Sequence, residues 1–310
     1  MEFFHKVTTY PFMRTRRMWY GVSIAAVIAS VVLLFWHGLN LGIDFTGGVV
    51  LEFAYPKPVN IEETRTALSK AGFEAQVQHF GDDRSIMVRL LPHAGSDINA
   101  TSAAVTQALK NVTPEVELRR AEVVGAQVGD ELTNQGGLAV LFTFILIGIY
   151  TWFRFQWKMG VSAVIATLHD PLLILGFFAV TQIPFDLAVL AAILAVIGYS
   201  LNDTVVVFDR VRENFHSMRK ATPEAIMDAS INQTLSRTII TSGATLLTVG
   251  VLLIEGGETL RGFSTALTIG ILVGTYSSIY VAGALALDLK LTARDLMKVE
   301  REKDEVDALP

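Results

Sequence analysis

Six long apolar runs constrain the fold of this chain more than any other feature. They cover about residues 19–36, 136–153, 161–181, 186–207, 238–254 and 262–286. A helix of roughly 20 apolar residues crosses the hydrocarbon core of a bilayer, and lipid offers no partner to a non-helical backbone. The pattern therefore predicts a multi-pass α-helical membrane protein with six transmembrane helices.

The first run follows a basic segment that contains Arg14, Arg16 and Arg17. A cleaved signal peptide shows the same order of charged and apolar residues. The run is long enough to span the bilayer, however, and the flank "WHGLNLGIDF" has no small-x-small cleavage pattern. We therefore predict an uncleaved signal-anchor helix. We interpret the arginines as its cytosolic flank and not as a twin-arginine signal.

The distribution of Lys and Arg predicts the orientation. The two short loops "TQIPFD" and "EGGETLRG" contain only Arg261, whereas basic residues are frequent in the N-terminal segment, in the connections 154–160 and 208–237 and in the C-terminal tail. Loops with an excess of Lys and Arg remain in the cytosol. We therefore predict cytosolic segments at 1–18 and 287–310 and an external region at 37–135.

The external region, 37–135, has the pattern of a small α+β domain. Strand-like and helix-like stretches follow in the order β-α-β-β-α-β, which is typical of a ferredoxin-like split βαβ fold. In "NIEETRTALSKAG", Asn60 is placed to cap a helix, Glu63 to complete a capping box and Gly72 to end the helix. The sequence therefore predicts a periplasmic ferredoxin-like domain between the first two transmembrane helices.

Residues 208–237 connect the fourth and fifth runs. The stretch "PEAIMDASINQTLSRT" carries apolar residues at roughly helical spacing, namely Ala225, Ile226, Ala229 and Leu235. We interpret it as a cytosolic amphipathic helix that lies along the membrane surface. A solvated linker is the alternative.

Asn202 and Asp203 lie inside the fourth apolar run. An unpaired carboxylate is expensive at bilayer depth, so a functional role is the default interpretation. Arg237 opens the fifth run from the same side of the membrane, and its long side chain can lie along the helix toward Asp203. We hypothesise that Asp203 exchanges protons beside Arg237. The alternatives are that Asp203 reaches the interface near its helix end, and that Arg237 is an ordinary basic flank.

His169 and Asp170 lie near the middle of the third run and are followed by Pro171. No flanking position explains polar residues at that depth. Proline removes a backbone hydrogen bond and can admit polar groups or water. His169 is suited to relay protons. A purely structural hydrogen bond between helices is the alternative.

The sixth run has small residues at every fourth position: Ala266, Gly270, Gly274, Ser278 and Ala282. Such rows allow two membrane helices to approach closely. We therefore expect Gly270 and Gly274 to pack against a neighbouring helix.

The sequence contains no motif of an enzyme, a P-loop or a metal site. Cysteine is absent, which excludes disulfides and thiolate ligands. His79 and His93 are isolated, and we interpret both as surface residues, while His169 and Asp170 alone supply too few ligands for a metal. We expect no catalysis, no metal, no organic cofactor and no nucleic-acid partner, with protons as the coupling ion.

Two stretches carry distinctive motifs. One is "LGIDFTGGVVLEF", which contains Gly42, Asp44, Gly47 and Gly48; the other is "VIGYSLNDTVVVFDRVRENF", in which Gly198 precedes Asn202 and Asp203. Both resemble the SecF family of bacterial protein-export subunits. The "GIDFTGG" motif is shared with SecD, whereas the second stretch separates SecF from SecD. The likeness extends over essentially the whole chain.

The resemblance implies a function and a set of partners. SecF resembles half of an RND-type transporter, and SecD supplies the other half in the bacterial inner membrane. The pair is implied to use the proton motive force to assist exported polypeptide chains after SecA has pushed them through the SecYEG channel. The resemblance further implies that Asp203 and Arg237 conduct protons, that His169–Asp170 match a family "HD" pair, and that "GIDFTGG" joins the first helix to the external domain.

Two alternatives use the same features. A proton-coupled small-molecule exporter of RND type also relies on intramembrane acids beside basic residues, but such pumps have large external regions in both halves. A structural scaffold for SecD would carry out no proton chemistry, and its polar membrane residues would tolerate apolar substitution.

Overall fold

The computed structural model describes residues 8–90, 98–292 and 295. Within these residues it contains six helices that are long and apolar enough to cross a membrane, at 12–36, 127–154, 157–181, 187–217, 223–255 and 259–288. The six predicted transmembrane helices are thus confirmed. Most of the predicted C-terminal tail, the first part of the N-terminal segment, and His93 lie outside the described residues.

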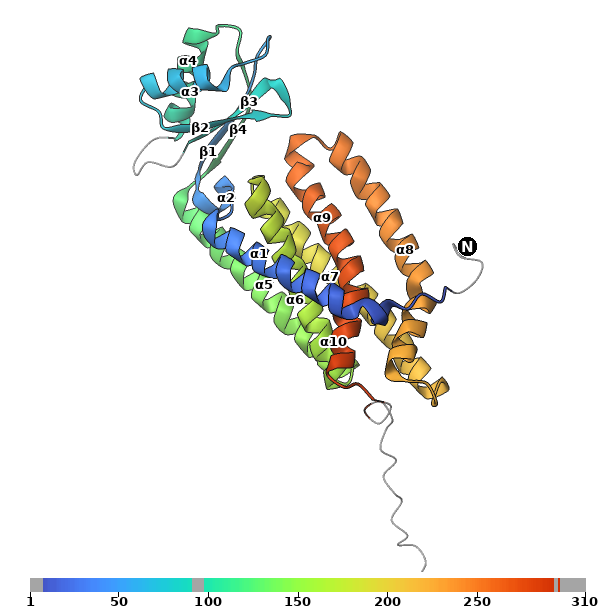
Figure 1. Cartoon of the computed structure of the whole chain (residues 1–310). Helices are drawn as coiled ribbons and strands as arrows, with labels where there is room; N and C mark the ends of the chain where they lie inside the picture. Colours follow the sequence, from blue (N-terminus) through green and yellow to red (C-terminus); the bar gives the residue numbers. More distant parts are fainter. Residues whose placement is uncertain (1–7, 91–97, 293–294, 296–310) are drawn as a thin grey trace, which may run out of the picture.

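The membrane helices are α1 (Arg16–Trp36), α5 (Ala126–Arg154), α6 (Trp157–Thr181), α7 (Leu187–Ser217), α8 (Pro223–Glu255) and α9 (Gly257–Ser277). A short 3-10 turn, η1 (Phe12–Thr15), precedes α1, and a π-helical turn, η2 (Ser278–Ala282), joins α9 to α10 (Gly283–Asp288). Figure 1 shows α1 crossing the bundle obliquely from the α+β domain toward η1. Helices α6, α7 and α9 form the buried centre, whereas α1, α5 and α8 are mostly exposed.

The stretch interpreted above as an amphipathic helix is helical, and it is continuous with the fifth span. Residues 208–217 continue α7, and residues 223–237 are the first part of α8. Thr222 caps α8 through its side chain and Pro223 occupies the first turn, both of which favour a helix start at this point. Because no proline interrupts the chain between there and Glu255, the amphipathic stretch and the membrane span form one helix.

Ion pairs join neighbouring helices at the end of the bundle opposite the α+β domain. Arg154 at the end of α5 pairs with Asp209 of α7, and Arg16 of α1 pairs with Glu224 of α8. Exposed pairs of this kind each contribute little to stability. Their main effect is to set the positions of the helix ends beside the loops that the sequence predicts to be cytosolic.

The α+β domain contains β1 (Gly48–Ala54), α3 (Ile61–Lys70), β2 (Ala75–Phe80), β3 (Asp82–Leu90), α4 (Ile98–Val112) and β4 (Glu117–Val124). The strands form one antiparallel sheet in the order β2-β3-β1-β4. Helices α3 and α4 cover the face away from the membrane helices (Figure 1). This is the predicted split βαβ arrangement, and its core is formed by fully buried apolar side chains that include Leu51, Phe53, Leu68, Ile86 and Val105.

The predicted ends of α3 are present, with one difference in detail. Asn60 caps the helix by accepting a hydrogen bond of 3.0 Å from the amide of Glu62, and Gly72 follows the helix with a φ of +87°. Glu63 accepts a hydrogen bond of 3.4 Å from the side-chain amide of Asn60 rather than from its backbone. The motif therefore marked the helix ends correctly, although the capping box is closed through side chains.

Candidate functional site

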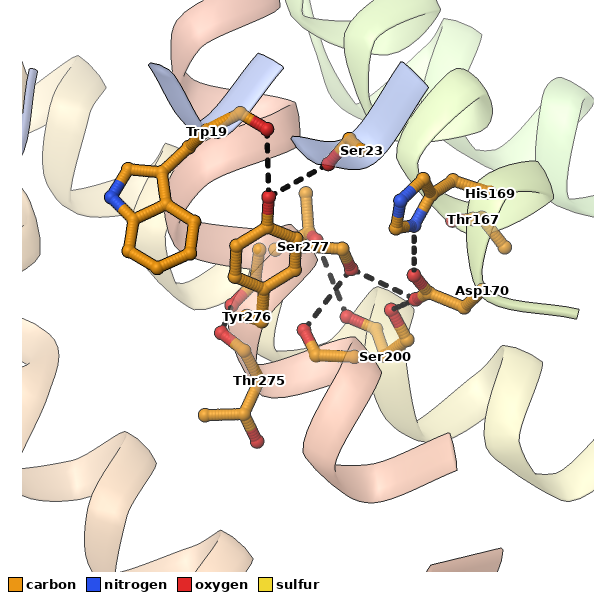
Figure 2. Close-up of polar contacts among 12 residues, drawn as sticks. Trp19, Ser23, Thr167, His169, Asp170, Ser200, Thr275, Tyr276 and Ser277 are labelled. Carbon is orange, nitrogen blue, oxygen red and sulfur yellow. Dashed lines mark hydrogen bonds and ion pairs between the residues drawn. The ribbon is translucent and has the colours of Figure 1, made fainter. Parts of the chain in front are cut away.

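Asp170 is the centre of a buried hydrogen-bonded cluster that joins three helices. Its side chain is 0% exposed. Its Oδ1 lies 2.9 Å from His169 Nδ1, and its Oδ2 accepts hydrogen bonds from Ser277 of α9 at 2.9 Å and from Ser200 of α7 (Figure 2). Both carboxyl oxygens therefore have partners, as a buried polar group requires. The structure brings the predicted His169–Asp170 pair together with residues of α7 and α9.

Tyr276 extends this polar region toward α1. Its hydroxyl donates to the carbonyl of Trp19 at 3.0 Å, so the 2.7 Å contact with Ser23 has the Ser23 hydroxyl as donor. Figure 2 shows the Tyr276 hydroxyl directed toward Trp19 and Ser23 of α1, and the centroids of the tyrosine and histidine rings are 6.3 Å apart. His169 Nε2 is buried and has no hydrogen-bond partner. Thus Nδ1 of His169 contacts Asp170, whereas Nε2 has no hydrogen-bond partner.

A second group of hydroxyls joins α7, α8 and α9. Ser242 of α8 shares a hydrogen bond of 2.8 Å with Thr275 of α9, and Tyr199 of α7 donates to Ser242 at 3.3 Å. Thr275 and Tyr276 are neighbours in the sequence, so this group lies next to the Asp170 cluster on α9. Polar side chains therefore connect five of the six spans, α1, α6, α7, α8 and α9, at one level of the bundle.

Asp203 lies on α7 in a different kind of environment. Its side chain is 3% exposed, and its Oδ2 is buried without a hydrogen-bond partner. Arg237 of α8 is near enough for its charge to act on the Asp203 carboxyl, but no ion pair joins these two described residues. Arg237 and Asn202 are both exposed on the surface of the bundle. The structure thus places the predicted partners on adjacent helices and leaves Asp203 Oδ2 without a hydrogen-bond partner.

The glycines predicted for helix packing line the contact between α9 and α7. A Cβ on Gly270 would lie 2.3 Å from Val196, and a Cβ on Gly274 would lie 3.0 Å from Ser200. The absence of a side chain at Gly274 therefore lets α9 approach the residue that bonds Asp170. Gly198, in contrast, has no atom within 4 Å of its Cβ position and lies on an open face of α7.

The glycines and Asp44 of the "GIDFTGG" motif lie where the first membrane helix meets the α+β domain. The motif forms α2 (Ile43–Thr46), which Gly42 precedes, and Asp44 Oδ2 accepts a hydrogen bond of 2.9 Å from the Leu187 amide at the start of α7. Gly47 and Gly48 have φ values of +66° and +125°, which a residue with a Cβ rarely adopts. A Cβ on Gly48 would also lie 2.4 Å from the carbonyl oxygen of Leu90.

Several residues of the cluster were not predicted from the sequence. Ser23, Ser200, Tyr276 and Ser277 are hydroxyl residues in apolar helices. Serine hydroxyls in helices commonly bond to the carbonyl of the preceding turn, so their presence alone gives no sign of a cluster. Their position relative to Asp170 depends on how the helices pack.

No metal centre is evident in the part of the chain that the structure describes. Within it, no three His, Cys, Asp or Glu side chains gather in an arrangement that could hold an ion. The polar clusters of the membrane helices are composed mainly of hydroxyl groups with a single His–Asp pair. Such groups can pass or hold protons, and they offer few ligands to a cation.

Comparisons with protein families match two parts of the chain. Residues 104–292 match the family described as "Protein export membrane protein SecD/SecF, C-terminal", and residues 32–59 match the "SecD/SecF GG Motif". The second match includes the motif that joins α1 to the α+β domain.

Similar proteins cover nearly the whole chain. It is 51% identical over 306 residues to the protein translocase subunit SecF of Vibrio alginolyticus, with 97% of both chains covered. Identity to the SecF subunit of Pseudomonas aeruginosa is 44%, with 98% of this chain and 99% of the relative covered. Identity to that of Escherichia coli O157:H7 is 41%, with 98% and 95% covered.

A solved structure shares the fold. The crystal structure of SecDF, a translocon-associated membrane protein from Thermus thermophilus, aligns with a TM-score of 0.83 and 36% sequence identity over 91% of this chain. The present chain spans 39% of that longer protein.

Proposed function

This chain belongs to the SecF branch of the SecD/SecF family of protein-export membrane proteins, and we propose that it uses the proton motive force to drive late steps of protein translocation. It is a translocase subunit, a transport component and not an enzyme. The observation that carries the proposal is Asp203, a buried membrane acid with an unpartnered carboxyl oxygen.

An unpartnered acid at this position suits a proton carrier. A protonated carboxyl needs no counter-ion in a membrane bundle, whereas a carboxylate needs a cation or hydrogen-bond donors. Arg237 is the nearby cation, and its exposed side chain is free to approach or withdraw. Each proton that leaves or joins Asp203 therefore favours a different placement of α8 relative to α7.

The available energy is adequate for this coupling. One charge that crosses the membrane releases about 2.3 kcal/mol per 100 mV. Roughly 5.5 kcal/mol is enough to reverse a two-state population from 1:99 to 99:1. A few protons per cycle would thus move the α+β domain between two positions.

Asp170 is assigned a different role in the proposal. Both of its oxygens are hydrogen-bonded, so it joins α6, α7 and α9 in the present conformation. His169 keeps one open nitrogen and is the member of this pair that can pass a proton. The structural alternative raised by the sequence thus fits Asp170, and the relay role fits His169.

We assign SecD to the open face of α7 as the direct partner. Small or polar residues are exposed along this face at helical spacing: Ala191, Ala195, Gly198 and Asn202. Small residues let another membrane helix approach closely. The solved SecDF chain, of which this chain spans 39%, supports an association with SecD. Contact on this face would bring SecD groups beside Asp203 and Arg237.

The remaining partners and the orientation rest on the family and on the charge pattern. The relative from Thermus thermophilus is described as translocon-associated, which supports a place beside the SecYEG channel, SecA and the exported polypeptide. Basic residues lie at helix ends beside the loops that the sequence predicts to be cytosolic, for example Arg154 at the end of α5 and Arg16 at the start of α1. By the positive-inside rule, both termini then lie in the cytosol of a bacterium and the α+β domain in the periplasm, with lipid around the bundle.

Export that depends on the proton gradient is the direct test. Inner-membrane vesicles carrying the subunit with SecD are compared for wild type, Asp203→Asn and Arg237→Met at equal abundance. We expect both variants to lose the gradient-dependent part of export while the complex remains assembled. Matched controls are Asp209→Asn on the same helix and Arg219→Met in the α7–α8 connection, which should behave as wild type.

The experiment also separates the alternatives. Full gradient-dependent export by Asp203→Asn would contradict the proton role and favour a scaffold for SecD. The small-molecule exporter receives no support from the comparisons, since the similar proteins are translocase subunits.

A further inference from the structure

The connecting segment, residues 39–47, runs between α1 and β1 and is bonded on both sides. We propose that Asp44 and Arg89 are positioning residues that clamp this segment between α7 and the sheet, so that movement of the α+β domain is transmitted to α7. The inference rests on the proposed function in one respect: α7 is the helix that carries Asp203.

Asp44 attaches the segment to the first turn of α7. The first amides of a helix have no partner within the helix. Asp186, the residue before α7, accepts from the Val189 amide at 2.8 Å, and Asp44 accepts from the Leu187 amide at 2.9 Å. The start of α7 is thus capped partly by its own preceding residue and partly by a side chain from far earlier in the chain.

Backbone hydrogen bonds reinforce this attachment. Gly42 donates to the carbonyl of Phe185 at 2.7 Å, and Phe185 donates to the carbonyl of Asn40 at 2.8 Å. These bonds form a short parallel bridge between Leu41 and Phe185. The connecting segment therefore pairs with the chain that enters α7 as a strand pairs with its neighbour.

Arg89 attaches the same segment to the sheet. It lies on β3, and its guanidinium donates to the Asn40 side chain at 3.3 Å, to Thr46 Oγ1 at 2.9 Å and to the Leu41 carbonyl. One arginine thus holds both ends of the segment. Because the guanidinium is a rigid planar fork, these bonds restrict rotation as well as separation.

The backbone segments around the clamp are closely packed. A Cβ on Gly42 would lie 3.1 Å from Asp186 Cβ, and one on Gly129 of α5 would lie 2.8 Å from the Gly47 amide nitrogen. Glycines here allow close approach of three chain segments. Residues 39–47 are therefore held as a packed joint, unlike a free linker.

Away from this joint, the sheet and the membrane helices are largely separated. A cleft of about 640 Å³ lies between them, lined by residues that include Gln78, Met87, Glu122 and Pro184. Arg120 of β4 crosses to Thr259 of α9 with a hydrogen bond of 2.9 Å. The clamp thus joins the sheet to the start of α7, and rotation of the sheet would pull on the first turn of α7. Asp203 lies about 24 Å further along that helix at 1.5 Å per residue.

Spin-label distances test the clamp without reference to proton flow. The chain has no cysteine, so Thr66→Cys on α3 and Glu255→Cys at the end of α8 provide two unique label sites in this subunit, which is studied in complex with a cysteine-free SecD. We expect Asp44→Ala and Arg89→Gln to broaden the distance distribution. The population at altered distances should rise about tenfold, since losing a hydrogen bond to a charged group changes an equilibrium constant by roughly that factor.

Conservative variants provide the controls. Asp44→Asn keeps an oxygen that can accept from Leu187 and should retain a narrow distance distribution. A variant that failed to fold would instead give a broad distribution. Arg84→Gln changes an exposed arginine on the same strand, β3, and should also leave the distribution narrow. A narrow distribution in both Asp44→Ala and Arg89→Gln would overturn the inference.

Export and proton flow, measured on the same complexes, distinguish this inference from the proposed function. The clamp variants should lose gradient-stimulated export while proton flow continues, whereas Asp203→Asn should lose both with the distance distribution unchanged. If Asp203→Asn exports normally and Asp44→Ala still broadens the distances and reduces export, the clamp stands and the proton proposal fails. Normal stimulated export in both clamp variants would contradict the clamp.

Discussion

Asp203 and Arg237 lie on adjacent helices but do not form an ion pair. Asp203 is 3% exposed, with Oδ2 unpartnered, while Arg237 is exposed on α8. Asp170, one helix away, has hydrogen-bond partners for both carboxyl oxygens. The two buried acids therefore have different roles. Asp170 is held in a structural cluster, whereas Asp203 has a carboxyl oxygen without a hydrogen-bond partner.

The same substitution should therefore change stability in opposite directions at these two acids. Asp203→Asn removes a carboxylate that has an unpaired buried oxygen and should stabilise the purified subunit by about 1 kcal/mol. Asp170→Asn replaces an acceptor-only group among three partners with an amide that has two donors, and should destabilise by about 2–3 kcal/mol. Thermal unfolding in detergent measures both, and a loss of stability in Asp203→Asn would contradict this difference.

Gly270 should be intolerant of a side chain. A Cβ at this position would overlap Val196, and overpacking of a closely packed interface costs about 1–3 kcal/mol. Gly270→Val should therefore lower the unfolding temperature and weaken the contact between α9 and α7. Gly250→Val on α8 is the matched control, because no atom lies within 4 Å of its Cβ position. Equal stability of the two variants would show that α9 does not depend on this close contact.

The ends of the helices show what apolar runs can and cannot predict. The six spans were predictable because lipid requires a long apolar helix, and hydropathy records that requirement directly. The continuation of α7 to Ser217 and the continuity of the amphipathic stretch with the fifth span were not, because polar helical turns beyond the lipid give no hydropathy signal. Those turns are supported by capping and tertiary contacts instead.

The residues of the candidate site likewise include some that could be predicted from the sequence and some that could not. Asp170, Asp203 and His169 stand out in the sequence because ionisable groups in apolar runs are expensive. Ser200 and Ser277 do not stand out, although they provide two of the bonds to Asp170. Arg89 gave no signal either, since an arginine on a strand is ordinary until the fold brings it to Asn40 and Thr46. Long-range contacts of this kind depend on tertiary structure.

Asp186 should make stability depend on pH at the start of α7. Burial raises the pKa of Asp186, and the charge of Asp44 acts in the same direction. Asp186 therefore loses its proton at a higher pH in the folded state than in the unfolded chain, where the pKa of an aspartate is about 3.9. The contribution of Asp186 is therefore fully present below that value and is lost as pH rises through the folded pKa.

The variant Asp186→Asn isolates this effect, because its side-chain oxygen can still accept from Val189. We expect the unfolding temperature of wild type, relative to Asp186→Asn, to fall as pH rises above about 4. Asp82 provides a control of opposite sign, since a hydrogen bond from Ser85 holds its pKa below the usual range. Relative to Asp82→Asn, wild type should gain stability as pH rises toward about 4 and should show no further change above it. A difference independent of pH for Asp186 would contradict the prediction.

Ser200 and Ser277 should be energetically coupled because both donate to Asp170 Oδ2. In Ser200→Ala or Ser277→Ala the oxygen keeps one donor, so each single change should cost about 1 kcal/mol. With both serines replaced, Oδ2 is buried without a partner, and the double variant should cost about 1–2 kcal/mol more than the sum. A double-mutant cycle of unfolding free energies measures this difference.

The pair Ser200→Ala and Ser242→Ala gives the reference for that cycle. Ser242 bonds Thr275 and Tyr199 and does not contact Asp170, so these two changes should add to within about 0.5 kcal/mol. Additive costs for Ser200 and Ser277 as well would mean that Asp170 Oδ2 finds another donor when both hydroxyls are gone. In that case Asp170 would not depend on α7 and α9 for its hydrogen bonds, and its role as the residue that joins the three helices would have to be given up.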